Sequence, residues 1–598
     1  MKLLTRIANI ADVKTGEYIR SRNLDGADEY KMVKATMNPI VPEKNQIEIV
    51  LENQSTITTS LEHPMLVYRD RWKYIPSAEV KVGDICQSSE GESSILEINP
   101  GNKDIHFCDF SVDGNENYYA GTTAKMMVVH NSATLYYPIW HLEVEDLLVL
   151  KNNKGTEDNR VRHMDYGVQF SKLFYERLIK NEDVTLFSPS DVPGLYEAFF
   201  EDQDKFKELY EQAERDPKVR KKTLKAVDLF SAFMEERKNT GRIYLMNVDH
   251  ANTHSSFKEE LAPIRMSNLC TEITLPTKPL KHIADEEGRI ALCTLSAINW
   301  GNVRSPSDFK KPCELAVRGL DALLDYQKYP ILAAELHSKE YRPLGIGIIN
   351  LAYFLAKNDS NYSTPNLELV DEYAEAWSYY LIKASVELAK DKGACTKVEH
   401  TKYSDGVLPI DTYKRDVDEL VKPNSRMDWD SLREDLKKYG IRNSTLMALM
   451  PAETSAQISN STNGIEPPRA FVSIKQSKDG VLKQVVPGYP RLKNKYELLW
   501  DQKSPEGYLK IMAVLQKYID QTISTNTSYN PEFYEGEKIP MSVMLQHLLF
   551  CYKFGIKTLY YFNTYDGQSE IDLDKEERDE KEKVLIEIID DACEACVI

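Results

Sequence analysis

The segment MSNLCTEITLPTKPL, residues 266–280, places Asn268, Cys270 and Glu272 at alternating positions. Successive side chains of a β-strand point to opposite faces, so in an extended strand all three would lie on one face. That face would carry an amide, a thiol and a carboxylate. Each residue alone has an ordinary structural explanation, because a buried Cys acts as a small apolar group and a strand Asn or Glu is often solvated. The surrounding sequence has to decide between the two interpretations.

The segments on both sides resemble the catalytic subunit of class I ribonucleotide reductases, and the likeness covers essentially all of residues 132–598. It implies the C-terminal part of an α/β barrel of about ten strands over residues 132–568. The matching segments are TLYYPIWHLEVEDLLVLKNN (134–153), NRVRHMDYGVQ (159–169), LFSPSDVPGLY (186–196), TGRIYLMNVDH (240–250), IALCTLSAINWG (290–301), LDALLDYQ (320–327), RNSTLMALMPAETSAQISNSTNGIEPPR (442–469) and KTLYYFNTYDG (557–567).

The resemblance implies a role for each polar residue of the opening segment. Cys270 would form the thiyl radical that abstracts the ribose 3'-hydrogen, Glu272 would be the base on the 3'-hydroxyl, and Asn268 would orient the substrate hydroxyls. Cys293 would be one of two thiols that reduce the 2'-position. The family carries the second thiol on an earlier barrel strand, and no cysteine between residues 132 and 269 can fill that role. We therefore expect this chain alone not to turn over.

Tyr560 and Tyr561 are adjacent in KTLYYFN, residues 557–563. Neighbouring aromatic residues of a strand usually pack on opposite faces as core. The resemblance instead implies that this pair passes an electron and a proton between Cys270 and a radical cofactor in a metal-containing small subunit. The pair favours class I over a cobalamin-dependent or glycyl-radical enzyme.

The segment PAETSAQIS, residues 451–459, resembles the substrate phosphate loop of the family. Backbone amides and hydroxyls at a helix start can bind a diphosphate, which makes Glu453, Thr454 and Ser455 the candidate substrate-binding residues. An ordinary capping turn has the same geometry. The class I likeness favours a ribonucleoside diphosphate over a triphosphate as substrate.

The C-terminal residues 569–598 begin with a dense charge run that is typical of a solvated helix or a mobile tail. They end in DDACEACVI, where Cys593 and Cys596 form a C-x-x-C pair. A metal site would need further ligands nearby. A dithiol that reduces the active-site disulfide, and is itself reduced by thioredoxin or glutaredoxin, fits better.

Residues 1–131 contain short β-prone runs separated by turn signals, which predicts an all-β module. Helical patterns at 143–152, 166–181 and 206–216, mixed with apolar runs at 242–248 and 557–563, predict α/β structure after it.

Segments of the first module resemble blocks B, F and G of inteins in the right order: TITTSLEHP (56–64), FCDFSVDGNENYYAG (107–121) and MMVVHN (126–131). The resemblance implies an all-β Hint fold. An asparagine amide can attack its own backbone carbonyl and break the following peptide bond when a neighbour assists.

Asn131 would be that cyclising residue and His130 its assistant. Ser132 would receive the acyl group from the upstream junction. His63, with Ser60 three residues before it, would activate the upstream scissile bond, and Asp109 keeps its expected place in block F.

Two departures from the intein pattern affect this interpretation. Block A is absent, because the chain starts with Met1, and Glu116 occupies a block F position where many inteins carry histidine. The first feature is typical of the C-terminal piece of a split intein. The second leaves the final cleavage mechanism open.

Together the two modules predict a trans-splicing precursor. Its partner would be an N-terminal reductase half that carries the N-intein, the missing thiol and the main sites for ATP and deoxynucleotide effectors. The spliced product would reduce ribonucleotides to deoxyribonucleotides for DNA synthesis. The alternatives are an inert fragment that no longer splices and cleavage at Asn131 without joining.

The composition sets limits on other functions. A net charge of -18 argues against a broad nucleic-acid surface. The N-terminus shows no signal peptide and no run approaches a membrane span, so we expect a cytoplasmic protein without bound metal. The nine cysteines are too sparse for a disulfide scaffold, and Cys313, Cys395 and Cys551 are expected to be buried thiols. The G-x-G at Gly345 and Gly347 is too weak a signal for a nucleotide site.

Overall fold

The computed structural model describes residues 134–566, apart from 153, 155–159, 163, 283–284, 330 and 478–479. Before residue 134, it describes residues 18–22, 28–37, 40–41, 46–51, 56–60, 64–69, 72–88, 91–100, 105–106, 109–112, 117–120 and 127–130.

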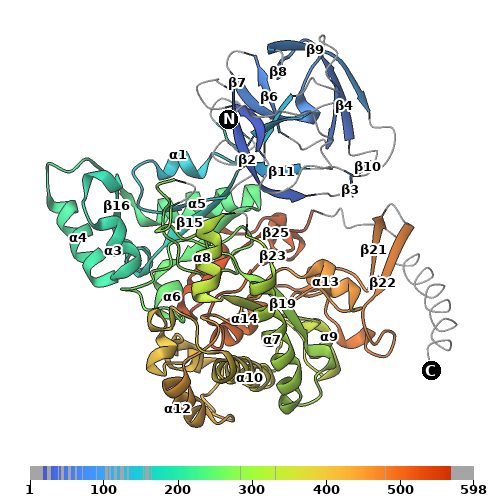
Figure 1. Cartoon of the computed structure of the whole chain (residues 1–598). Coiled ribbons are helices and arrows are strands. Elements are labelled where there is room, and N and C mark those ends of the chain that lie inside the picture. Colours follow the sequence, from blue (N-terminus) through green and yellow to red (C-terminus); the bar gives the residue numbers. More distant parts are fainter. Residues whose placement is uncertain are drawn as a thin grey trace.

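The described residues before 134 are almost entirely β-structure (Figure 1). The largest sheet has the order β12-β13-β6-β8-β9-β4-β5, with β7 paired to β6. Alternate residues of its strands, such as Ile49, Leu51, Met65 and Val67, are fully buried in one small core. The β-strands predicted for this region are confirmed. The strands are β1 (Tyr18–Arg22), β2 (Asp28–Met37), β3 (Ile40–Val41), β4 (Gln46–Leu51), β5 (Thr56–Ser60), β6 (Pro64–Tyr68), β7 (Trp72–Pro76), β8 (Ile85–Ser88), β9 (Gly91–Pro100), β10 (Ile105–His106), β11 (Asp109–Val112), β12 (Asn117–Ala120) and β13 (Met127–His130).

From residue 134 onward the structure is mixed α/β. Its strands are β14 (Thr134–Pro138), β15 (Asp165–Phe170), β16 (Asp183–Phe187), β17 (Lys221–Lys225), β18 (Ile243–Asn247), β19 (Thr294–Asn299), β20 (Leu344–Ile349), β21 (Val472–Ser477), β22 (Gly480–Val485), β23 (Thr527–Tyr529), β24 (Thr558–Leu559) and β25 (Phe562–Thr564). Its helices are α1 (Val144–Leu148), α2 (Lys172–Ile179), α3 (Leu195–Glu201), α4 (Gln203–Arg215), α5 (Ala226–Thr240), α6 (Val248–Thr253), α7 (Lys310–Tyr326), α8 (Leu332–Tyr341), α9 (Leu351–Lys357), α10 (Leu367–Lys392), α11 (Pro409–Thr412), α12 (Trp429–Tyr439), α13 (Glu453–Ile458), α14 (Glu506–Gln516) and α15 (Met541–Lys553).

Two groups of parallel strands form the centre of this part. The first has the order β14-β15-β18 and continues into β24, which runs antiparallel to β18. The second starts with β19 and β20 and continues through the parallel bridges Ile346–Met447 and Leu449–Ile523. The Thr558 hydroxyl of β24 donates to the Ile523 carbonyl at 2.8 Å and links the two groups. The result is an arc whose two outer strands are β14 and β19.

Every residue of β18 and β20 is buried, as expected for parallel strands that are covered on both faces. Helix α10 packs against α7, α12 and α14, and Figure 1 shows α7, α10 and α12 together at one end of the molecule. Cys313, Cys395 and Cys551 are buried thiols, which confirms the expectation for them.

Two expectations need correction or remain open. The pattern at 166–181 predicted one helix, but its first five residues belong to β15, and α2 starts only at Lys172. The near-continuous apolar run of a buried strand resembles a helical pattern over so short a length. The strands of the described residues form no closed ring, so the ten-stranded barrel stays a prediction.

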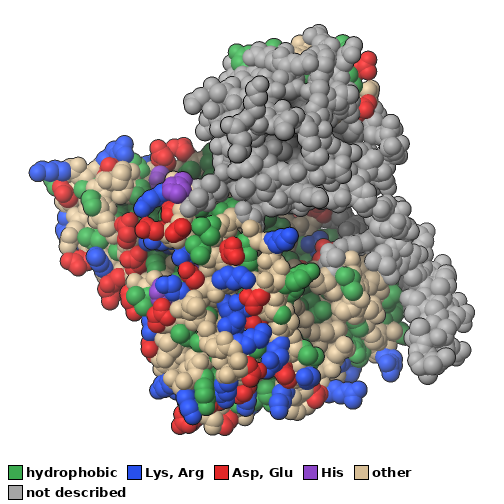
Figure 2. Space-filling model, viewed as in Figure 1, with side chains coloured by type: hydrophobic (Ala, Val, Ile, Leu, Met, Phe, Trp, Pro, Cys, Tyr) green, Lys and Arg blue, Asp and Glu red, His purple; other side chains and the backbone are tan. Residues whose placement is uncertain are grey.

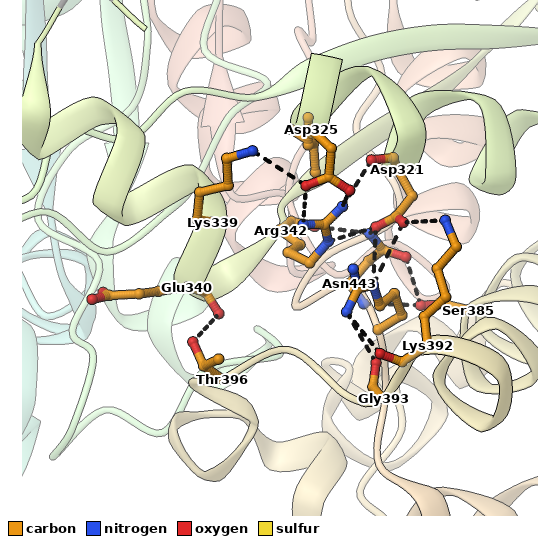
Figure 3. A network of polar contacts seen from close by, with 12 residues as sticks. Asp321, Asp325, Lys339, Glu340, Arg342, Ser385, Lys392, Gly393, Thr396 and Asn443 are labelled. Carbon is orange, nitrogen blue, oxygen red and sulfur yellow. Dashed lines mark hydrogen bonds and ion pairs between the residues drawn. The ribbon is translucent and has the colours of Figure 1, made fainter. Parts of the chain in front are cut away.

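A buried polar network joins α7 to the entry of β20 (Figure 3). The fully buried Asp321 carboxylate accepts from Arg342 Nε at 2.6 Å and from Asn443 Nδ2 at 3.2 Å. Arg342 also donates to Asp325 at 2.8 and 2.9 Å. Since Arg342 ends α8 in the left-handed region, with φ of 48°, this network fixes the turn from which β20 starts.

Acidic and basic side chains alternate over the visible face of the described residues, without a broad basic region (Figure 2). Within the described part of the chain, no helix is both long and apolar enough to cross a membrane.

Candidate active site

The segment with Asn268, Cys270 and Glu272 is a turn inside the arc, which corrects the expectation of a strand. Residues 266–275 form no strand, and the Thr271 amide donates to the Asn268 carbonyl at 3.3 Å. Thr271 adopts a φ of +65°, a conformation that is costly for a β-branched residue. The Thr558 hydroxyl lies 3.0 Å from the Thr271 carbonyl, shares its proton between this carbonyl and that of Ile523, and helps to hold the turn. The positions of the three side chains therefore result from this turn and not from the alternation of side chains along a strand.

The turn brings Asn268 and Glu272 into direct contact. The Asn268 amide nitrogen donates to Glu272 Oε1 at 2.8 Å, and the Ser524 hydroxyl lies 3.3 Å from Oε2. Glu272 is only 2% exposed, and burial raises the pKa of its carboxyl. A carboxyl whose pKa is shifted toward neutrality can both accept and return a proton during a reaction.

Cys270 lies between Ser524 and Tyr560. The Ser524 hydroxyl donates to the Cys270 carbonyl, and Cys270 Sγ lies 3.5 Å from the Tyr560 hydroxyl, within hydrogen-bond distance for sulfur. Burial raises the pKa of the thiol, and the nearby Glu272 carboxylate adds to the shift. The thiol therefore stays protonated near neutral pH and keeps a hydrogen atom to lose.

Tyr560 and Tyr561 lie in a break between β24 and β25, with their rings on the same side. Their ring centroids are 3.8 Å apart, and the Tyr560 hydroxyl donates to the Tyr561 hydroxyl at 2.6 Å. A continuous strand would have sent the two rings to opposite faces. Burial is the main cause that raises the pKa of Tyr560, so its phenol is neutral. Cys270, Tyr560 and Tyr561 thus form an unbroken series of contacting S–H and O–H groups.

Cys293 directly precedes β19 and contacts Gln521, whose amide nitrogen donates to Cys293 Sγ at 3.5 Å. The Gln521 side-chain oxygen accepts from the Thr274 amide at 3.2 Å, which links this thiol to the turn that carries Cys270. Burial raises the pKa of Cys293 to about 12.

Cys293 packs against Gly345 of β20, and this is the structural reason for the first glycine of the G-x-G. A Cβ on Gly345 would lie 2.5 Å from Leu295 Cδ2 and 3.0 Å from Cys293 Sγ. We expect Gly345→Ala to lower the free energy of unfolding by about 1–3 kcal/mol, because a well-packed core resists added volume. Urea denaturation of the chain measures this change.

Gly319 is the matched control, since a Cβ there would meet nothing within 4 Å in the exposed middle of α7. Gly319→Ala should raise the stability by roughly 0.5–1 kcal/mol, because glycine is a poor helix former. Equal effects of the two substitutions would contradict the crowding argument.

The other candidate residues lie elsewhere in the chain. Glu453, Thr454 and Ser455 form the first turn of α13, where Glu453 and Ser455 are exposed. The small core of Ile349, Ala452 and Ala456 packs α13 against the end of β20. Asn131, Ser132, His63, Glu116, Cys593 and Cys596 lie outside the described residues. Ser60 ends β5, Asp109 starts β11 and His130 ends β13, and only their backbones are described.

Sequence reasoning missed several residues that complete the site. The Tyr136 hydroxyl of β14 donates to the Asn268 carbonyl at 2.7 Å. Gln521 contacts Cys293, and Ser524 contacts Cys270. The centroid of the Tyr244 ring lies 5.0 Å from that of Tyr560. Their partners are 132 to 316 residues away, by difference of residue numbers, so no local motif carried the signal.

Within the described residues, no group of three or more His, Cys, Asp or Glu side chains is arranged to hold a metal ion.

The family model described as ribonucleotide reductase, barrel domain, matches residues 130–562. The chain is 61% identical over 444 residues to the ribonucleoside-diphosphate reductase subunit alpha of Haemophilus influenzae, covering 74% of this chain and 59% of that protein. Identity to ribonucleoside-diphosphate reductase 1 subunit alpha of Escherichia coli is 57% over 470 residues, covering 78% of this chain and 61% of that protein.

The subunit alpha of Enterobacteria phage T4 is 48% identical over 450 residues, covering 74% of this chain and 59% of that protein. The chain thus spans about three fifths of the length of the curated relatives it matches.

Proposed function

Since this chain belongs to the ribonucleotide reductase family, through its barrel domain, we propose that residues 132–598 are the C-terminal part of a ribonucleoside-diphosphate reductase large subunit. The observation that carries the proposal is the contact series from Cys270 Sγ to the Tyr560 hydroxyl and on to Tyr561. Each group can lose an electron and a proton together. The oxidising equivalent would come from a metal-containing small subunit.

The residues around Cys270 support reduction of a ribose. As a thiyl radical, Cys270 would take the 3'-hydrogen atom and become a thiol again. Glu272, whose pKa is raised by burial, would accept the 3'-hydroxyl proton, and Asn268, bonded to it at 2.8 Å, would orient the hydroxyls. Cys293 and a second thiol from the rest of the reductase would supply two electrons and two protons and become a disulfide. The 2'-hydroxyl would leave as water, and Cys270 would return the hydrogen atom to C3'. Electrons from thioredoxin or glutaredoxin would then return through Cys593 and Cys596.

The diphosphate would bind at the first turn of α13, where the backbone amides of Glu453, Thr454 and Ser455 start a helix. Helix α13 packs beside the end of β20, the strand whose Gly345 lies against Cys293. This neighbourhood supports a substrate held between the phosphate turn and the thiols.

Exposed apolar side chains support completion of the site by further reductase sequence. Leu135 on β14 and Leu295 on β19 are 50% and 39% exposed, and these are the two outer strands of the arc. Leu269 and Leu292, next to the two thiols, are 49% and 40% exposed. The missing thiol and the main ATP and deoxynucleotide sites would belong to that further sequence.

We further propose that the sequence is joined by protein splicing in trans at Asn131 and Ser132. The support is the resemblance of the intein blocks and the pairing of β13 with β6, where Val129 faces Met65. This pairing puts the strand that ends at His130 beside the strand that begins directly after His63.

The test is to mix the chain with a polypeptide that carries the N-terminal reductase sequence followed by an intein block A. Intact mass spectrometry should detect a product that joins both halves and lacks residues 1–131. Addition of the small subunit, thioredoxin and its reductant should then yield deoxycytidine diphosphate from cytidine diphosphate. Asn131→Ala should abolish the joined product, because alanine has no side-chain amide to cyclise.

The outcomes separate the two proposals. Release of residues 132–598 without joining would mean cleavage only, and an unchanged mass would mean that this intein does not splice. A joined product without nucleotide reduction would contradict the reductase assignment.

A further inference from the structure

Arg237 is a fully buried cation behind the tyrosine pair, in the last turn of α5. Its Nη1 donates to the Tyr560 carbonyl at 2.7 Å and to the Ile243 carbonyl, and its Nη2 donates to the Tyr561 carbonyl at 3.2 Å. One guanidinium therefore binds the backbone of both tyrosines. Nothing in the motifs of the sequence indicated this contact.

The charge of Arg237 has no anionic partner among the groups that act on it. Those groups are Tyr529, Cys551 and Tyr244, and burial raises the pKa of each, so none is negative near neutral pH. Burial lowers the pKa of Arg237 to about 10, which still leaves it protonated. Its buried Nε has no hydrogen-bond partner among the described residues. A buried cation without an ion pair is costly and needs a specific reason to be there.

The backbone at Tyr560 and Tyr561 supplies that reason. Consecutive carbonyls of a regular strand point in opposite directions, whereas both carbonyls here reach the same guanidinium. The strand is interrupted at these two residues, and both rings lie on one side, 3.8 Å apart. A planar fork with several donors in fixed directions suits two successive carbonyls held in one arrangement.

We propose that Arg237 is a positioning residue for radical transfer: it holds the carbonyls of Tyr560 and Tyr561 together, so that their rings lie against each other and the Tyr560 phenol contacts Cys270. The neighbouring groups complete the arrangement, since the Tyr560 amide donates to the Thr525 carbonyl at 2.8 Å and the Tyr561 amide donates to Asn526 Oδ1 at 2.9 Å. Without Arg237 the two carbonyls lose their shared donor, and we expect the segment to relax toward a regular strand, which would separate the rings. The effect on catalysis rests on the proposed function, but the geometry does not.

The first test uses the full chain with 3-fluorotyrosine at position 561 and measures its ¹⁹F resonance. Tyr560→Leu gives the reference shift of a Tyr561 ring without its aromatic neighbour. Arg237→Met should move the resonance most of the way to that reference. Arg237→Lys, which keeps the charge but has no fork, should give an intermediate shift. Lys238→Met is the matched control in the same helical turn and should leave the resonance unchanged.

The second test measures turnover in the complete reductase with its small subunit. Arg237→Met should lower kcat by about 100-fold, the scale expected when reacting groups are displaced by about 1 Å, while KM for the diphosphate stays unchanged. An unshifted ¹⁹F resonance in folded Arg237→Met would overturn the proposal. If that variant does not fold, the resonance of Arg237→Lys decides instead. If the native enzyme does not reduce nucleotides, the reductase function fails, and the ¹⁹F result still decides the role of Arg237.

Discussion

Replacing Tyr560 with Phe should lower nucleotide reduction in the complete enzyme by at least about 1000-fold, the scale seen when one member of a group that acts as a unit is removed. The phenol of Tyr560 is the only described group that contacts both Cys270 Sγ, at 3.5 Å, and the Tyr561 hydroxyl, at 2.6 Å. Phenylalanine keeps the ring but has no O–H to lose. An electron and a proton could then no longer pass together between Cys270 and Tyr561.

The same substitution should change the free energy of unfolding by no more than about 1 kcal/mol, because it removes one or two hydrogen bonds and leaves a partly exposed partner, the Tyr561 hydroxyl. Turnover is measured as deoxycytidine diphosphate formed in the presence of the small subunit. Stability is measured by urea denaturation of the chain alone.

Tyr529→Phe is the matched control. Tyr529 is also buried, stacks on Phe562 at 4.8 Å and bonds His547 at 3.0 Å, but it does not contact Cys270. The Tyr529→Phe enzyme should retain turnover within a few-fold of the native value. A Tyr560→Phe enzyme that keeps native turnover would rule out the contact series as the route to Cys270.

The sequence predicted this series in part. The family resemblance identified Cys270, Tyr560 and Tyr561, and the structure brings these three together. The strand conformation expected from local sequence was wrong for both segments, and for the same reason. Period-two alternation assumed continuous strands, but Thr271, with φ of +65°, turns the first segment, and the second is interrupted at the tyrosines.

Those departures depend on residues that are remote in sequence. Thr558 holds the Thr271 carbonyl, and Arg237 holds the carbonyls of Tyr560 and Tyr561 over a separation of more than 320 residues. Propensity and periodicity describe neighbours along the chain, so they predicted β-structure in the first 131 residues and the helices α1 and α4 but could not predict such contacts. The roles of the intein residues and of Cys593 and Cys596 stay predictions.

Asp321→Asn should lower the free energy of unfolding by about 3 kcal/mol, because it removes the buried carboxylate that faces three cations. Asp321 is fully buried, and its carboxylate faces Arg342 at 2.6 Å, Arg442 at 3.4 Å and Lys392 at 3.7 Å (Figure 3). An asparagine would have no charge and would present an amide N–H₂ toward these donors. Asp325 keeps its pair with Arg342, which is why the expected loss lies at the low end for a broken buried pair.

Asp325→Asn removes the exposed carboxylate that pairs with the same arginine, Arg342. The Asp325 side chain is 48% exposed, and its pKa is lowered to about 2, chiefly by hydrogen bonds from Arg342. Water screens this pair, so its loss should cost less than that of Asp321. The two midpoints in urea at neutral pH give the comparison.

The network can also affect the position of the Cys293 thiol. Arg342 starts the turn into β20, and Gly345 of β20 packs against Cys293. If Asp321→Asn loses stability and also lowers turnover more than Gly319→Ala does, the network fixes the register of β20 beneath Cys293. If Asp321→Asn loses stability but keeps turnover, the buried neighbours of β20 fix its position, and Arg342 only links α8 to α7. An unchanged urea midpoint would mean that desolvation of Asp321 offsets its attraction to the three cations, so the network would select one arrangement without stabilising it.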